Sequence, residues 1–119
     1  MTSERDLVEV HVTTPDRESA LGIARILVDR RLAACVQVVP GVTSVYSWDG
    51  ETQVDDEHLL LAKTTGDLFG PIRDAVRAEH PYDTPEVLAV AVTACDPGYA
   101  DWLRGNVLSV GGTEGSEET

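Results

Sequence analysis

Two alternating runs of residues meet at Asp49-Gly50 and predict a long β-hairpin. One face of the first run carries Val42, Ser44, Tyr46 and Trp48. Asp-Gly is a favoured pair for a two-residue hairpin turn, so a returning strand should follow. Residues 51–57 of that strand are polar, and residues 58–65 are mostly apolar. We therefore expect a ribbon with a solvated tip and an apolar base, and such a ribbon usually needs a partner to cover it.

Periodic patterns on both sides of this hairpin predict the remaining elements. Strands are expected at residues 7–13, 32–39 and 86–94, and helices at residues 15–31, 67–79 and 97–103. Pro40-Gly41 does not necessarily end the direction of the second strand, which leads into the hairpin. The last strand is apolar on both faces, which is typical of a strand covered on each side. The order strand, helix, strand, strand, helix, strand is the ferredoxin-like βαββαβ plan of the α+β class, here with a long β-hairpin and a short C-terminal helix.

Prolines and short polar residues mark the expected helix starts. Thr14-Pro15-Asp16 provides a capping hydroxyl, a proline suited to the first helical position and an acid near the positive helix end. Asp67 or Gly70, with Pro71, opens the second helix, and Asp96-Pro97 caps the third.

Length and charge limit the organisation of the chain. The 119 residues form one domain, expected at residues 7–105, with a flexible N-terminus at 1–6 and an acidic disordered tail at 106–119. A formal charge of -12 repels phosphate backbones and anionic lipid, so neither nucleic acid nor a membrane is expected as a partner. No apolar run reaches the roughly 20 residues of a membrane span, and the start lacks signal-peptide features. We expect a cytoplasmic protein.

The two cysteines, Cys35 and Cys95, lie in apolar strand-like runs without Cys-x-x-Cys spacing. This pattern argues against a zinc knuckle or a dithiol redox pair. We expect both to be buried, reduced thiols.

Residues 79–86 hold the candidate metal ligands. Pro81 and Pro85 bias the preceding residues towards extended geometry, which would place His80 and Glu86 on one face. Neutral imidazole suits copper, nickel or zinc, and Glu79 and Glu86 are the nearby carboxylates. The alternative is that His80 is a helix C-terminal histidine placed favourably at the negative end of the helix dipole.

Four blocks in order resemble the CutA family of divalent-cation tolerance proteins over roughly residues 7–105. The blocks are residues 31–36, 46–48, 80–86 and 99–103. The resemblance implies a homotrimer whose hairpins join sheets between subunits, and a role in divalent-metal tolerance with copper as a weakly bound ion. In members of the family this chain resembles, the proposed copper ligands are a cysteine at the end of the first strand and one or two histidines just before Pro-Tyr. Here Val12 or Thr13 replaces the cysteine and Glu79 replaces the extra histidine, so only His80 carries over.

The sequence leaves two other functions open. No nucleophile elbow, phosphate-binding loop, metalloprotease pair or dinucleotide fingerprint is present, so we do not expect an enzyme. A trimeric small-molecule sensor of the PII-like type is an alternative, with a subunit cleft for a small anion or nucleotide. A scaffold trimer without a metal role is another. The candidate cleft residues are Tyr46, Trp48, Lys63, Tyr82 and Trp102.

Overall fold

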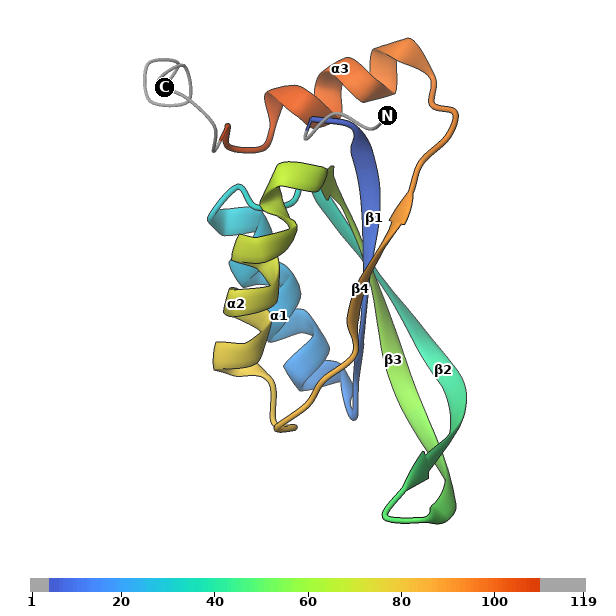
Figure 1. Ribbon diagram of the computed structural model, residues 1–119. Helices are drawn as coiled ribbons and strands as arrows, with labels where there is room; N and C mark the ends of the chain where they lie inside the picture. The colour runs from blue at the N-terminus through green and yellow to red at the C-terminus, as the bar shows by residue number, and fades with distance from the viewer. Residues whose placement is uncertain (1–4, 110–119) are drawn as a thin grey trace.

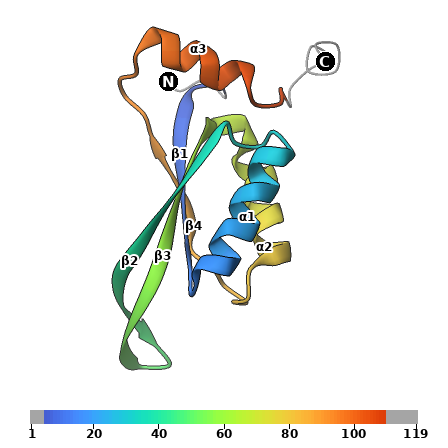
Figure 2. The ribbon, with the colours of Figure 1, turned by 180° about the vertical axis from the view of Figure 1, so that it is seen from behind.

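The computed structural model describes residues 5–109 as a four-stranded antiparallel sheet with two helices on one face (Figures 1 and 2). The strand order is β2-β3-β1-β4. This arrangement confirms the expected α+β class and the expected order of elements. In chain order the elements are β1 (Leu7–Thr14), α1 (Arg17–Asp29), β2 (Cys35–Trp48), β3 (Glu51–Thr65), the short 3₁₀ helix η1 (Gly66–Leu68), α2 (Phe69–Glu79), β4 (Val87–Ala91) and α3 (Pro97–Gly105).

The hydrophobic core lies between the sheet and helices α1 and α2. Alternation along β1 turns Val10 and Val12 towards the helices, and both are fully buried. Helical spacing brings the apolar stripes of α1 and α2 onto them; the stripes are Ala20, Ile23, Ala24 and Leu27, and Ile72, Ala75 and Val76. Val107, beyond α3, packs into the same core at 5% exposure. Ordered packing thus continues past Gly105.

Parts of the expected terminal segments lie within the described residues. Arg5, in the segment expected to be flexible, forms an ion pair with Asp67 at 3.1 Å. Residues 1–4 and 110–119, the latter holding most of the expected acidic tail, lie outside the part of the chain that the structure describes. None of the helices within residues 5–109 is long and apolar enough to cross a membrane.

The predicted hairpin is confirmed and extends well beyond the helical layer (Figure 1). Asp49 and Gly50 have φ values of 53° and 78°, the left-handed backbone that a two-residue turn requires. β2 runs through Pro40-Gly41 as one strand, with a register shift between Val39 and Val42. The projecting ribbon makes the molecule elongated, with extents of 48 × 27 × 23 Å.

The predicted start of the first helix was wrong by two residues. Helix α1 begins at Arg17, and the cap is Asp16, whose Oδ1 accepts the Ser19 amide at 2.8 Å. The Thr14 hydroxyl instead donates to the Asp16 carbonyl at 2.9 Å. Asp16 takes the cap because its backbone is extended, at φ -149°, and its carboxylate reaches the first turn. The Asp96 cap of α3 is confirmed.

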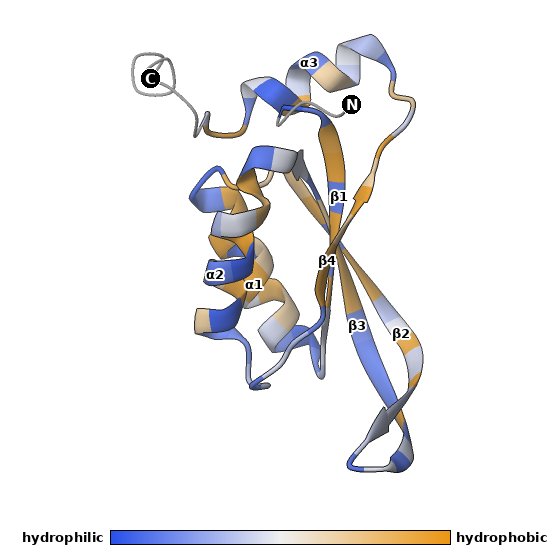
Figure 3. Ribbon diagram, viewed as in Figure 1, coloured by the Kyte–Doolittle hydropathy of each residue, from blue (hydrophilic) through white to orange (hydrophobic). Residues whose placement is uncertain are grey.

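The last strand is shorter and more exposed than predicted. β4 pairs with β1 only from Val87 to Ala91, and Leu88 and Val90 are 42% and 46% exposed. Pairing stops there because β1 itself begins at Leu7, which accepts one further bond from the Val92 amide at 3.1 Å. Within the described chain β4 is therefore an edge strand, and Figure 3 shows that its residues are largely hydrophobic.

The cysteines also depart from expectation. Both are free, but Cys95 is exposed and Cys35 is only partly buried. Cys95 loses its expected burial because it follows the end of β4 rather than lying inside the strand.

Candidate functional site

His80 ties the end of α2 to the end of β1. Its amide donates to the Val76 carbonyl at 2.8 Å and closes the helix. The ring is buried; Nε2 lies 2.7 Å from the Thr13 carbonyl oxygen, and Nδ1 lies 3.0 Å from the Tyr82 amide nitrogen. A ring that donates through Nε2 and accepts through Nδ1 is a neutral imidazole with both nitrogens engaged. The geometry therefore gives His80 a structural role in this chain.

The two carboxylates paired with His80 in the sequence prediction lie at the surface. Glu79 and Glu86 are both exposed, and residues 81–84 form bends instead of an extended run. Among residues 5–109, no three His, Cys, Asp or Glu side chains gather as metal donors. An ion bound at His80 would first have to displace one of the two ring hydrogen bonds.

The candidate cleft residues fall into separate groups within one chain. Tyr46 and Trp48 lie on β2 in the hairpin, and Tyr82 follows α2. Trp102 lies on α3 at the opposite end of the molecule, where it stacks on Tyr99 with ring centroids 5.5 Å apart (Figure 1). Lys63 belongs to a third group on the sheet.

Lys63 is part of a polar chain across the helix-free face of the sheet. Its Nζ donates to Glu9 Oε2 and to Gln37 Oε1, each at 2.7 Å. Glu9 Oε1 in turn lies 2.7 Å from His11 Nε2. The hydrogen bond from Lys63, followed by that from His11, lowers the pKa of the Glu9 carboxyl. The ammonium is thus already neutralised and is not a free anion-binding group.

Tyr46 in the hairpin and Tyr82 after α2 lie close to acidic side chains of β3. The Tyr46 hydroxyl donates to Asp55 Oδ2, and this bond raises the pKa of Tyr46 to about 12. Partial burial, and then the negative charges of Glu57 and Asp55, raise the pKa of Tyr82. The Tyr82 ring also packs on His80 at a centroid distance of 4.9 Å. Two phenols and two carboxylates thus meet where the ribbon leaves the body of the molecule.

Asp55 and Glu57 were missed by the sequence reasoning, which treated residues 51–57 as a solvated tip. A usable signal was present, because a two-residue turn at Asp49-Gly50 pairs Tyr46 with Gln53. Alternation then puts Asp55 and Glu57 on the Tyr46 face. The register counted from the turn therefore predicts that Asp55 and Glu57 lie on the same face as Tyr46.

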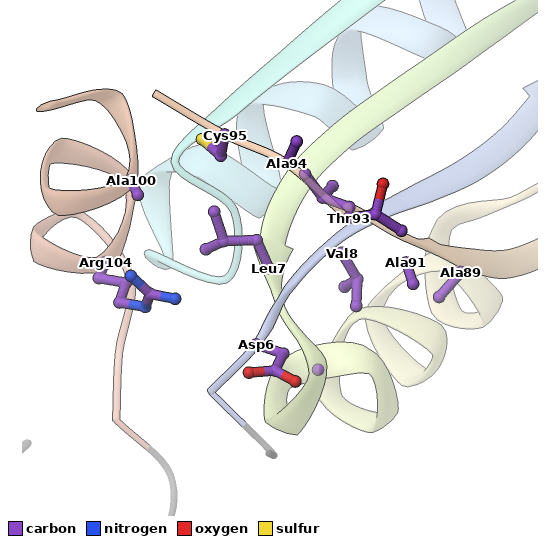
Figure 4. A pocket seen from close by; sticks show the side chains of 12 residues that line it. Asp6, Leu7, Val8, Ala89, Ala91, Thr93, Ala94, Cys95, Ala100 and Arg104 are labelled. Atoms are coloured by element: carbon purple, nitrogen blue, oxygen red, sulfur yellow. The ribbon is translucent and has the colours of Figure 1, made fainter. Parts of the chain in front are cut away.

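A groove lies between α3 and the ends of β1 and β4 (Figure 4). It encloses about 950 Å³ and is open on one side. Most of its lining is apolar and small, and Asp6 and Arg104 stand at its edge. The lining residues are Asp6, Leu7, Val8, Gly66, Ala89, Ala91, Val92, Thr93, Ala94, Cys95, Ala100 and Arg104.

Comparison with known proteins identifies the family. The model of the CutA1 divalent ion tolerance protein family matches residues 8–106. The chain belongs to this family. It is 48% identical over 97 residues to the divalent-cation tolerance protein CutA of Thermus thermophilus, covering 82% of this chain and 94% of that protein. It is 44% identical to the chloroplastic protein CutA of Arabidopsis thaliana, but spans only 53% of that protein's length.

CutA1 structures share the fold. The Thermus thermophilus CutA1 structure superposes with a TM-score of 0.83 at 46% identity, covering 85% of this chain and 98% of that one. CutA1 from Shewanella gives a TM-score of 0.84 at 31% identity, covering 90% and 100%. These matches confirm the resemblance inferred from the four sequence blocks.

Proposed function

We propose that the chain is the subunit of a homotrimer that takes part in tolerance of, or response to, divalent metal ions. The observation that carries the proposal is the match of residues 8–106 to the CutA1 divalent ion tolerance family. Growth of cells lacking the protein in excess Cu²⁺ tests it. We expect the full chain to restore growth, and an unrestored defect would contradict the proposal.

Exposed apolar side chains support the trimer. Val45, Val54 and Trp48 on the hairpin are 66%, 64% and 59% exposed. Leu88 and Val90 add an apolar strip along the free edge strand β4. A stable monomer rarely leaves this much apolar surface and two unpaired sheet edges in water, whereas association between copies covers both.

Metal binding in this proposal is weak and is lost in acid. Its candidate ligands are His80, Glu79 and Glu86, and an imidazole binds metal only when it is deprotonated. Calorimetric titration with Cu²⁺ should give low affinity, because His80 must release a hydrogen bond to bind. His80→Ala should remove the pH-dependent part, and Glu86→Gln should weaken it. Copper binding unchanged in His80→Ala would place the ion elsewhere on the acidic surface.

The PII-like sensor is the alternative, and it requires the separated cleft residues to meet between subunits. Titration with ATP and with metal ions under the same conditions distinguishes the two functions. We place the protein in the cytoplasm and propose no enzymatic activity. Related proteins are described as chloroplastic in Arabidopsis thaliana and periplasmic in Archaeoglobus fulgidus, so fractionation of the native cells is the direct test of location.

A further inference from the structure

One face of the hairpin base combines a buried carboxylate with two partly exposed phenols. Tyr46, Asp55 and Glu57 share this face because cross-strand partners point the same way. Their partners in the register are Gln53, Ser44 and Val42. Tyr82 reaches the same place from the segment after α2, where its phenol interacts with Glu57. The two arms of the hairpin and the segment after α2 thus build one site.

Glu57 is the unusual member of this group. It is 7% exposed, yet no basic side chain within residues 5–109 forms an ion pair with it. The Tyr82 phenol is a neutral partner. A buried carboxylate without a cation is costly, so a cation that completes the site would recover free energy on binding.

The surroundings of Glu57 select the type of cation. Among the described residues no three metal donors converge, so a divalent ion would find too few ligands here. Tyr46 and Tyr82 are instead 40% and 39% exposed as residues and provide aromatic side chains near the carboxylate. A guanidinium group suits both features, since its planar fork bridges carboxylate oxygens and its face stacks on aromatic rings.

We propose that Glu57, Tyr46 and Tyr82 form a recognition site for a guanidinium group, carried either by a small molecule or by an arginine side chain. The hydrogen bond from Tyr46 to Asp55 fixes one ring of the site and keeps a second carboxylate beside it. The chain's formal charge of -12 draws cations towards this surface. The site adjoins His80, whose Nδ1 accepts the Tyr82 amide, but the proposal does not depend on metal binding.

Titration of the full chain with butylguanidinium, followed by calorimetry at low ionic strength, tests the proposal. We expect saturable binding that weakens about tenfold in Glu57→Gln, because a charge-assisted hydrogen bond is lost. Tyr82→Leu, which removes the aromatic face but keeps an apolar side chain, should also weaken binding. Butylammonium should bind less well than butylguanidinium, since it cannot bridge or stack.

Asp101→Asn is the matched control, because it removes one exposed carboxylate on α3 at the other end of the molecule (Figure 1). Its affinity for butylguanidinium should equal that of the wild type. Equal affinity in Glu57→Gln and wild type would overturn the proposal, and so would the absence of saturable binding. Should Glu57→Gln fail to fold, unchanged affinity in Tyr82→Leu overturns it instead.

Light scattering distinguishes the two sources of the guanidinium. If an arginine of a second copy fills the site, butylguanidinium competes with it and lowers the measured mass. If the ligand is a small molecule, the mass stays the same while binding is still saturable. Either result, together with the loss in Glu57→Gln, supports recognition of a guanidinium group.

Discussion

The Tyr46 hydroxyl donates to Asp55, and ionisation of the phenol would place two negative charges side by side. The hydrogen bond first, and then partial burial and the Asp55 charge, raise the pKa of Tyr46 from 10.0 to about 12. The stabilisation from this bond is present below about pH 10 and is lost as the pH rises through about 12. Absorbance titration should show a late tyrosine ionisation in the wild type that moves to lower pH in Asp55→Asn. Asp101→Asn should leave it in place.

The Glu9 carboxylate is expected to affect stability at low pH. Its pKa is lowered from 4.5 by the hydrogen bonds from Lys63 and then His11. A lowered pKa contributes stability that is present above about pH 4.5 and is lost as the pH falls through the folded-state pKa. Urea unfolding between about pH 7 and 3 should therefore show a smaller acid loss for Glu9→Gln than for the wild type. An identical loss in both would contradict the role given to this carboxylate.

His80 is expected to matter for folding whatever it does with metals. His80→Ala leaves the Thr13 carbonyl and the Tyr82 amide without their side-chain partner and opens a cavity, at a cost of about 2–3 kcal/mol. Urea unfolding of the variant and the wild type at neutral pH measures this loss of stability. His11→Ala should cost less, because it removes a partly buried side chain whose Nε2 lies 2.7 Å from Glu9 Oε1. An equal loss of stability in the two variants would contradict the structural role of His80 in connecting α2 to β1.

At the scale of elements, the hairpin depends on the left-handed backbone of its turn. Gly50 has φ 78°, so Gly50→Val forces a β-branched residue into a disfavoured region at a cost of about 1 kcal/mol or more. Gly22→Ala is the control: Gly22 lies inside α1 and nothing within 4 Å opposes a Cβ, so stability should rise by up to about 1 kcal/mol. Thermal unfolding of both variants checks the opposite signs.

Features with local causes could be predicted from the sequence, and features that depend on distant partners could not. The turn at Asp49-Gly50 follows from its own two residues, and the hairpin was predicted correctly. The length of β4 depends on where its partner β1 begins, which its own apolar run cannot show. The interaction of Glu57 with Tyr82 joins residues 25 positions apart, and the second lies in a segment after another helix. The sequence pattern therefore identified His80 as a residue of interest at the end of α2. It did not show that Asp55 and Glu57 lie beside Tyr46 and Tyr82.

At the scale of the whole molecule, the proposed trimer makes a direct prediction about mass. Light scattering should give about three times 12.8 kDa for the full chain. Val90→Glu places a charge on the exposed apolar strip of β4 and should lower the mass towards that of a monomer. Glu18→Gln, on the exposed side of α1, should leave it unchanged. A wild-type mass near 12.8 kDa would contradict the assembly.

A sheet that ends in β2 on one side and β4 on the other offers two different edges to other copies of itself. When the β2 edge of one copy pairs with the β4 edge of the next, the same rotation relates every pair of neighbours. The assembly then either closes into a ring or continues as an open fibre. β2 also carries a register shift between Val39 and Val42, and an irregularity of this kind bends a strand. If the proposed trimer forms through these edges, the bend in β2 sets part of the angle between neighbouring copies, and that angle determines whether self-addition stops at a closed ring or polymerises without limit.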